Sequence, residues 1–116
     1  MRITLSKLQS QERKEQRELD EFWATAIKNR DNWECVICGS KYAPNAHHII
    51  PRENKSYRYE EDNGISLCVK HHKFSRIISA HNNPLAFFLW LMLYRPDQYF
   101  KAVKRTRQLT KGECDL

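Results

Sequence analysis

The chain reads CVIC at residues 35–38, AHHIIPR at residues 46–52 and NGISLCVKHH at residues 63–72. These motifs hold three of the four cysteines and four of the five histidines in the 116-residue sequence. Thiolate and imidazole are the usual protein ligands of zinc and related ions. Their concentration in one third of the chain therefore predicts a metal site.

The spacing divides these ligands into two sets. Two half-sites with the same three-residue separation predict a closed, tetrahedral zinc shell of structural type. The predicted zinc ligands are Cys35, Cys38, Cys68 and His71. Three histidines of the motifs remain, and any catalysis has to come from them: His47, His48 and His72.

In this arrangement the sequence resembles the HNH endonucleases, also called ββα-metal nucleases. The resemblance rests on the histidine pair before Ile49-Ile50-Pro51, on Asn63 before an apolar strand, and on Leu67-Cys68 leading into two histidines. It runs from Cys35 to about His72 and includes the zinc knuckle of many members, with a looser likeness to phage members beyond. It implies an α+β fold with a small ββα core.

The resemblance also implies a role for individual residues. His48 is the general base, and Asn63 holds the loop beside it, although Asn-Gly is also an ordinary hairpin turn. His47 and His72 bind one catalytic divalent ion, for which Mg²⁺, Mn²⁺, Ni²⁺, Co²⁺ and Zn²⁺ are all candidates. Spacing alone leaves open which of His71 and His72 serves which ion.

Two positions depart from the common pattern of the family. His71 stands where a fourth cysteine is more frequent, a replacement that zinc tolerates. His47 stands where aspartate is frequent, as it does in some members. His81 follows the motif and supplies either a third ligand to the catalytic ion or a loop contact.

The charge balance points to nucleic acid. A formal net charge of +6 indicates a polyanionic partner, and double-stranded DNA is the expected one. The candidate contacts are basic side chains in or near the motifs: Arg52, Lys55, Arg58 and Arg76. An ordinary solvated loop is the alternative for the residues after Pro51, where basic and aromatic side chains alternate.

The chain is expected to be a cytoplasmic protein, in the host cytoplasm if a phage encodes it. The first seven residues do not resemble a secretory signal, and Cys-x-x-Cys thiols are typical of a reducing compartment. Cys114 has no partner motif and is expected to be an unligated thiol. The apolar run at residues 85–93 is shorter than the roughly twenty residues of a membrane span, so no membrane is expected. That run leaves a homodimer open.

One domain of three parts is predicted: a helical arm at residues 1–34, the zinc-stapled core at 35–81 and helices at 82–116. Helical periodicity predicts a helix over residues 10–30. Its apolar face consists of Leu19, Phe22, Trp23, Ala26 and Ile27. Strands are expected at residues 46–50 and 65–67.

Three more helices are expected after the second strand. The first runs from Val69 to about Ser79 and buries an apolar side made of Phe74, Ile77 and Ile78. Asn83 and Pro84 predict the start of the next. Its expected buried face consists of Leu85, Phe88, Leu89 and Met92. Arg95-Pro96 ends this helix, and a last one follows over residues 97–107.

The sequence as a whole predicts a metal-dependent HNH endonuclease. It would hydrolyse phosphodiester bonds of DNA in one strand or both, leaving the 5′-phosphate and 3′-hydroxyl ends that the family implies. The alternative is a catalytically inactive, zinc-dependent module that only binds nucleic acid. A general base and spare metal ligands favour the nuclease, because a binding module needs neither.

Overall fold

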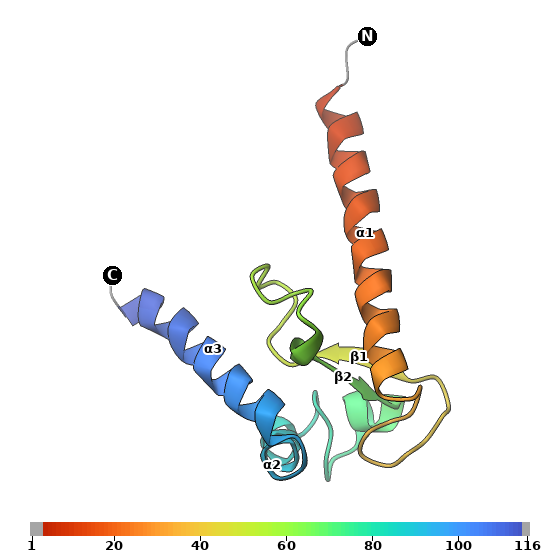
Figure 1. Ribbon diagram of the computed structural model, residues 1–116, viewed down its shortest axis with the longest axis vertical. Coiled ribbons are helices and arrows are strands. Elements are labelled where there is room, and N and C mark those ends of the chain that lie inside the picture. Colours follow the sequence, from red (N-terminus) through yellow and green to blue (C-terminus); the bar gives the residue numbers. More distant parts are fainter. Residues whose placement is uncertain (1–3, 115–116) are drawn as a thin grey trace.

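The computed structural model describes residues 4–114, except for the side chains of residues 112–114, so Cys114 as a thiol lies outside the described part. At its centre lies an antiparallel hairpin of β1 (Asn45–His48) and β2 (Gly64–Leu67). Three helices extend from this hairpin: α1 (Leu5–Arg30), α2 (Pro84–Tyr94) and α3 (Pro96–Cys114). The predicted α+β class is confirmed, and α1 and α3 diverge from the core (Figure 1).

Helix α1 contacts the hairpin only with its last turns. Thr4 caps its start by accepting a hydrogen bond from the Lys7 amide (3.3 Å), so the helix begins five residues before the predicted position. Of its predicted apolar face only Trp23 and Ile27 are buried. The other end of the helix projects away from the hairpin (Figure 1).

The prediction of a helix over residues 69–79 is wrong beyond the first turn. A π-helical turn, η2 (Lys70–Phe74), follows β2 and ends where Ser75 becomes extended. The Ser75 hydroxyl accepts hydrogen bonds from the amides of Ile77 and Ile78 (3.2 and 3.1 Å) and so replaces the helical bonding pattern. Ile77 is 83% exposed and Phe74 is also exposed, so the predicted apolar side is absent there.

Helix α2 starts as predicted but buries a different face. Asn83 caps it by accepting from the Ala86 amide (3.2 Å), with Pro84 in its first turn. Phe87 and Leu91 are the buried residues, whereas Leu85 is 71% exposed. Phe88 and Leu89 of the expected face are exposed as well. The helix is apolar all round, so its periodicity could not indicate which side meets the core.

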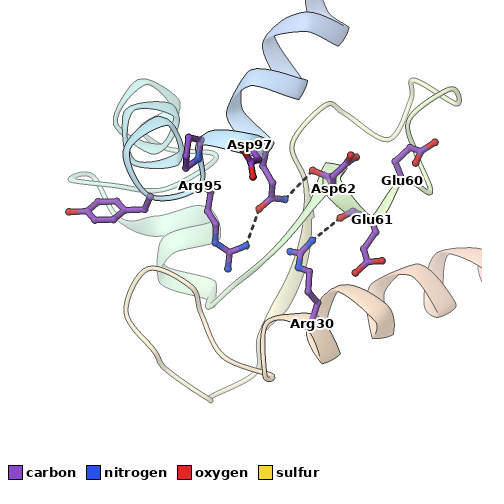
Figure 2. A pocket seen from close by; sticks show the side chains of 9 residues that line it. Arg30, Glu60, Glu61, Asp62, Arg95 and Asp97 are labelled. Carbon is purple, nitrogen blue, oxygen red and sulfur yellow. Dashed lines mark hydrogen bonds between the residues drawn. The ribbon is translucent and has the colours of Figure 1, made fainter.

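Polar side chains attach the C-terminal helices to the core (Figure 2). Gln98 of α3 donates hydrogen bonds to the carbonyl oxygens of Asp62 and Gly64 (3.0 and 2.8 Å). Arg30 of α1 also donates to the Gly64 carbonyl (2.7 Å). Arg95, between α2 and α3, donates to Gln98 (3.0 Å). The start of β2 is therefore held by both α1 and α3.

No helix in residues 4–114 is both long enough and apolar enough to span a membrane. Helix α3 begins at Pro96 and is longer than the expected 97–107.

Candidate metal centres and active site

Four predicted zinc ligands converge at the end of the hairpin. Their ligand atoms all lie within 4.8 Å of one another in the cluster Cys35, Cys38, Cys68 and His71. The sulfurs of Cys38 and Cys68 are 3.7 Å apart, and His71 Nδ1 is 3.6 Å from Cys35 Sγ and 3.4 Å from Cys68 Sγ. Ligands of tetrahedral zinc lie about 3.8 Å apart for two sulfurs and about 3.6 Å for sulfur and nitrogen. The donor set is therefore compatible with structural zinc.

The first half-site is shaped by a tight turn. The Gly39 amide donates to the Cys35 carbonyl (2.7 Å), and Gly39 has a φ of +76°, in the left-handed region that favours glycine. The Val36 amide donates to the Ser66 carbonyl (3.0 Å) and fixes this turn to β2. Because Cys68 directly follows β2, the two half-sites meet.

The protonation states of this cluster fit a cation. Burial raises the pKa of the Cys35 thiol to about 11, so a bound cation is needed to keep that sulfur as thiolate at neutral pH. Burial and the nearby Lys70 charge lower the pKa of His71, which favours the neutral imidazole that can bind metal.

A second cluster contains His47, His72 and His81, whose ligand nitrogens also lie within 4.8 Å of one another. The chain after η2 turns back along it, and the His81 amide donates to the His72 carbonyl (3.0 Å). This return brings His81 beside His72, with the ring centroids 4.6 Å apart. The sequence had left His81 open between ligand and loop contact.

Two of these imidazoles, His47 and His72, favour metal binding over protonation. Burial and the neighbouring His72 and His81 lower the pKa of His47 to about 3, and burial with His81 and Lys73 lowers that of His72 to about 4. The Nε2 atoms of His72 and His81 are 3.1 Å apart. Two nitrogens on one tetrahedral ion lie about 3.3 Å apart, so the donors fit a shared cation.

The ring of His48 contacts different neighbours from the ring of His47, as expected for adjacent strand residues, although both residues line the cavity described below. Its ring stacks on the indole of Trp23 with centroids 3.8 Å apart and planes 10° apart. His48 Nε2 lies 3.0 Å from the carbonyl oxygen of Arg58. A carbonyl only accepts, so Nε2 carries the proton and Nδ1 is the basic nitrogen of the neutral ring. Burial and the Arg58 and Arg52 charges lower the pKa of His48, while this hydrogen bond and Asp20 oppose them.

Asn63 fixes the loop that follows β1. It is 2% exposed and lies at the end of η1 (Glu61–Asn63), the turn before β2. Its Oδ1 accepts from the Ile50 amide (2.8 Å), and its Nδ2 donates to the carbonyls of Ile50 and Tyr57 (3.0 and 3.1 Å). The side chain therefore closes the loop at both ends.

One cavity of about 450 Å³ brings the histidines together. Its lining consists of Ala46, His47, His48, Pro51, Arg52, Glu53, His72, Lys73 and His81. Of the basic candidates, Arg52 thus reaches the cavity, while Lys55 and Arg76 are exposed outside its lining. Arg58 is engaged elsewhere, since its guanidinium pairs with Asp20 (2.7 Å). Sequence inspection had not singled out Lys73.

A larger hollow of about 530 Å³ lies between the end of α1, η1 and the α2–α3 junction (Figure 2). Three of its charged lining residues form ion pairs: Arg30 and Arg95 both pair with Asp31, and Asp62 pairs with Lys101 and Arg105. It holds none of the histidines or cysteines. The candidate catalytic histidines therefore line the smaller cavity and not this one.

Residues 35–74 match a family model described as HNH endonuclease. This segment, about a third of the chain, is therefore of the HNH endonuclease family, and the resemblance found in the sequence is confirmed for it. The family indicates nuclease activity in general, a nucleic-acid substrate and a divalent metal. No curated protein and no solved structure matches the chain. Trp23 and His81 both lie outside the matched segment.

Proposed function

We propose that the chain is a metal-dependent endonuclease that hydrolyses phosphodiester bonds of DNA. In this proposal His48 is the general base, and His47, His72 and His81 hold one divalent ion. The observation that supports it most is that the base and the three ligands line the same cavity. Zinc at the cysteine cluster serves the fold alone.

His48 activates the attacking water. Its Nδ1 is available as the base because Nε2–H donates to the Arg58 carbonyl, and its lowered pKa keeps the ring neutral at pH 7. Nδ1 takes a proton from water as the water oxygen forms a bond to phosphorus. The bond from phosphorus to the 3′ oxygen breaks, and that oxygen is protonated from solvent. The products have 5′-phosphate and 3′-hydroxyl ends.

The ligand nitrogens of the three histidines lie close enough to share one divalent ion, and the lowered pKa values of His47 and His72 let these two bind it without losing protons at neutral pH. When bound, such an ion supplies neutralisation of the phosphate and stabilisation of the departing oxygen. Phe87 of α2 packs edge-on against the His47 ring, with centroids 5.6 Å apart and planes 89° apart. This contact keeps the first ligand oriented toward the other two.

Contacts between basic side chains and the phosphate backbone of DNA are expected to dominate the affinity. Arg52 and Lys73 border the cavity and offer positive charge to the phosphates beside the scissile bond. Lys55 contributes from the exposed loop. Because these contacts release counterions, binding should weaken steeply as salt rises.

The test is cleavage of supercoiled plasmid by the purified chain in Mg²⁺, Mn²⁺, Co²⁺, Ni²⁺ or Zn²⁺. At least one ion should support nicking or linearisation. His48→Ala should lower the rate by a factor of about a hundred to ten thousand, the usual cost of losing a general base. Its DNA affinity and zinc content should stay unchanged.

Arg52→Ala and Lys55→Ala form a matched pair of controls. Both remove one positive charge, but only Arg52 lines the cavity, so only Arg52→Ala should lower the cleavage rate at saturating DNA. Wild-type cleavage by His48→Ala would remove the base assignment. Failure of every ion to support cleavage of DNA, with DNA binding intact, would favour the binding module instead.

A further inference from the structure

The surroundings of His48 come largely from a helix outside the HNH segment. Trp23 of α1 is 5% exposed, and its ring covers one face of the His48 imidazole at 3.8 Å. The indole Nε1 donates to the Glu60 carbonyl (2.9 Å), which fixes the indole within its own plane. The plane of the imidazole is therefore set by a side chain that is itself held at its edge.

A second residue of α1, Asp20, acts on His48 indirectly, through Arg58. The carboxylate of Asp20 binds Arg58 in a two-pronged pair, with distances of 2.9 and 2.7 Å to Nε and Nη2. The Arg58 side chain also donates to the Arg52 carbonyl (3.2 Å). The backbone carbonyl of this same Arg58 receives the His48 Nε2–H. Asp20 thus anchors the residue that sets the tautomer of His48.

The hairpin is shaped to let α1 come this close. His48 pairs across the hairpin with Gly64, so the indole of Trp23 lies over this cross-strand pair. A Cβ atom at Gly64 would lie 2.5 Å from Trp23 Cζ2 and 2.6 Å from the side chain of Ile27. Such distances are not tolerated, so only glycine permits the docking of α1 at this point.

We propose that Trp23 and Asp20 are positioning residues for His48, and that α1 is part of the catalytic unit. The inference rests on the proposed role of His48 as base. A base must be held in a narrow range of orientations to take a proton from water at the attacking position. Trp23 restricts the tilt of the ring, and Asp20 acts through the Arg58 carbonyl to keep the proton on Nε2.

Nuclear magnetic resonance of the zinc-loaded protein tests the geometry without any cleavage. In the wild type the carbon-bound protons of the His48 ring should be displaced upfield by the indole ring current, and its nitrogens should report the Nε2–H tautomer. Trp23→Leu should abolish the displacement, whereas Trp23→Phe should keep part of it. Asp20→Ala should raise the Nδ1–H fraction.

Single-turnover cleavage at saturating DNA and metal tests the consequence. Trp23→Leu and Asp20→Ala should lower the rate about tenfold to a hundredfold with unchanged affinity for DNA and metal, and Trp23→Phe should restore most of it. Asp62→Ala is the matched control for Asp20→Ala: it removes a carboxylate that pairs with Lys101 and Arg105 and does not touch His48. It should cleave at the wild-type rate.

The outcomes separate this inference from the proposed function. If His48→Ala is inactive and Trp23→Leu cleaves like the wild type, the positioning role is wrong and the base assignment stands. If His48→Ala is fully active, the base assignment itself fails, whatever the spectra show. If Trp23→Leu loses zinc or its cooperative unfolding transition, it does not test positioning, and the results for Trp23→Phe and Asp20→Ala decide whether the positioning role is correct. If Asp20→Ala has the His48 tautomer and the cleavage rate of the wild type, Asp20 is not a positioning residue.

Discussion

The carboxylate of Asp31, at the end of α1, accepts a hydrogen bond from Arg95, 64 positions later at the junction of α2 and α3 (3.2 Å). The same carboxylate binds Arg30 (2.9 and 2.7 Å) and accepts from the Ser66 amide in β2 (3.0 Å). Its side chain is 2% exposed. One buried carboxylate therefore joins the N-terminal helix, the hairpin and the C-terminal helices.

Asp31→Asn should destabilise the fold by on the order of 2 kcal/mol at pH 7. Breaking a fully buried ion pair costs about 3–5 kcal/mol, and the part-exposed guanidinium groups of Arg30 and Arg95 reduce that figure. Urea unfolding of the zinc-loaded proteins measures the difference. A variant as stable as the wild type would show that the charge of Asp31 does not stabilise the joining of the three elements.

The pH dependence of that difference has a definite sign. Burial opposes ionisation of Asp31, but hydrogen bonds from Arg30 and the Ser66 amide and the charges of Arg30 and Arg95 outweigh it, so its folded-state pKa lies below 3.8. The unfolded chain then binds the proton more readily. The stabilising contribution is therefore complete well above pH 3.8 and is lost as pH falls through the folded-state pKa. Protonation of the zinc ligands affects both proteins and cancels in the difference.

Removal of a zinc ligand should unfold the core. Cys35→Ser and Cys68→Ser should lose zinc and the cooperative unfolding transition, because zinc binding and folding are coupled in small metal-stapled domains. Metal analysis and thermal unfolding monitored by circular dichroism test this. Cys114→Ser, far from both half-sites in sequence, should keep one zinc per chain. A zinc-free preparation with the wild-type transition would refute the structural role.

The sequence was most informative where one short motif decides the geometry. The doubled three-residue spacing predicted the cluster of Cys35, Cys38, Cys68 and His71, because each half-site is a local turn. The Asn83-Pro84 cap of α2 was likewise local. The helix after β2 was not predictable in extent, since the hydroxyl of Ser75 competes with the backbone and ends it early.

Contacts across the fold were not readable from the sequence. The stack of Trp23 on His48 joins two residues that come together only when α1 docks on the hairpin. The helical periodicity of the α1 sequence indicated an apolar face but not the residue that this face would contact. His81 reaches His72 only because the intervening loop folds back on its own serine and asparagine side chains. Arg58 was a predicted phosphate contact, but its guanidinium pairs with Asp20 and is largely buried. The sequence did not indicate this pairing.

The loop position of His81 leads to a prediction that separates ligand from base. His81 is the most exposed of the three clustered histidines, and its Nε2 lies 3.1 Å from that of His72. His81→Ala should weaken binding of the catalytic ion and lower cleavage at limiting metal. Because His47 and His72 remain, activity should recover at high metal concentration, which cannot happen when the base His48 is missing. Metal titrations of plasmid cleavage by His81→Ala and His48→Ala measure this contrast.

Zinc content provides the control for that experiment. His81→Ala and His72→Ala should each retain one structural zinc per chain, whereas His71→Ala should lose it, because His71 Nδ1 lies with the cysteine sulfurs. If His72→Ala loses zinc and His71→Ala keeps it, the two histidines are exchanged. If His81→Ala requires no more metal than the wild type for half-maximal cleavage, His81 is not a ligand. The ion is then held by His47 and His72 alone, with more of its coordination positions left for water and phosphate oxygens.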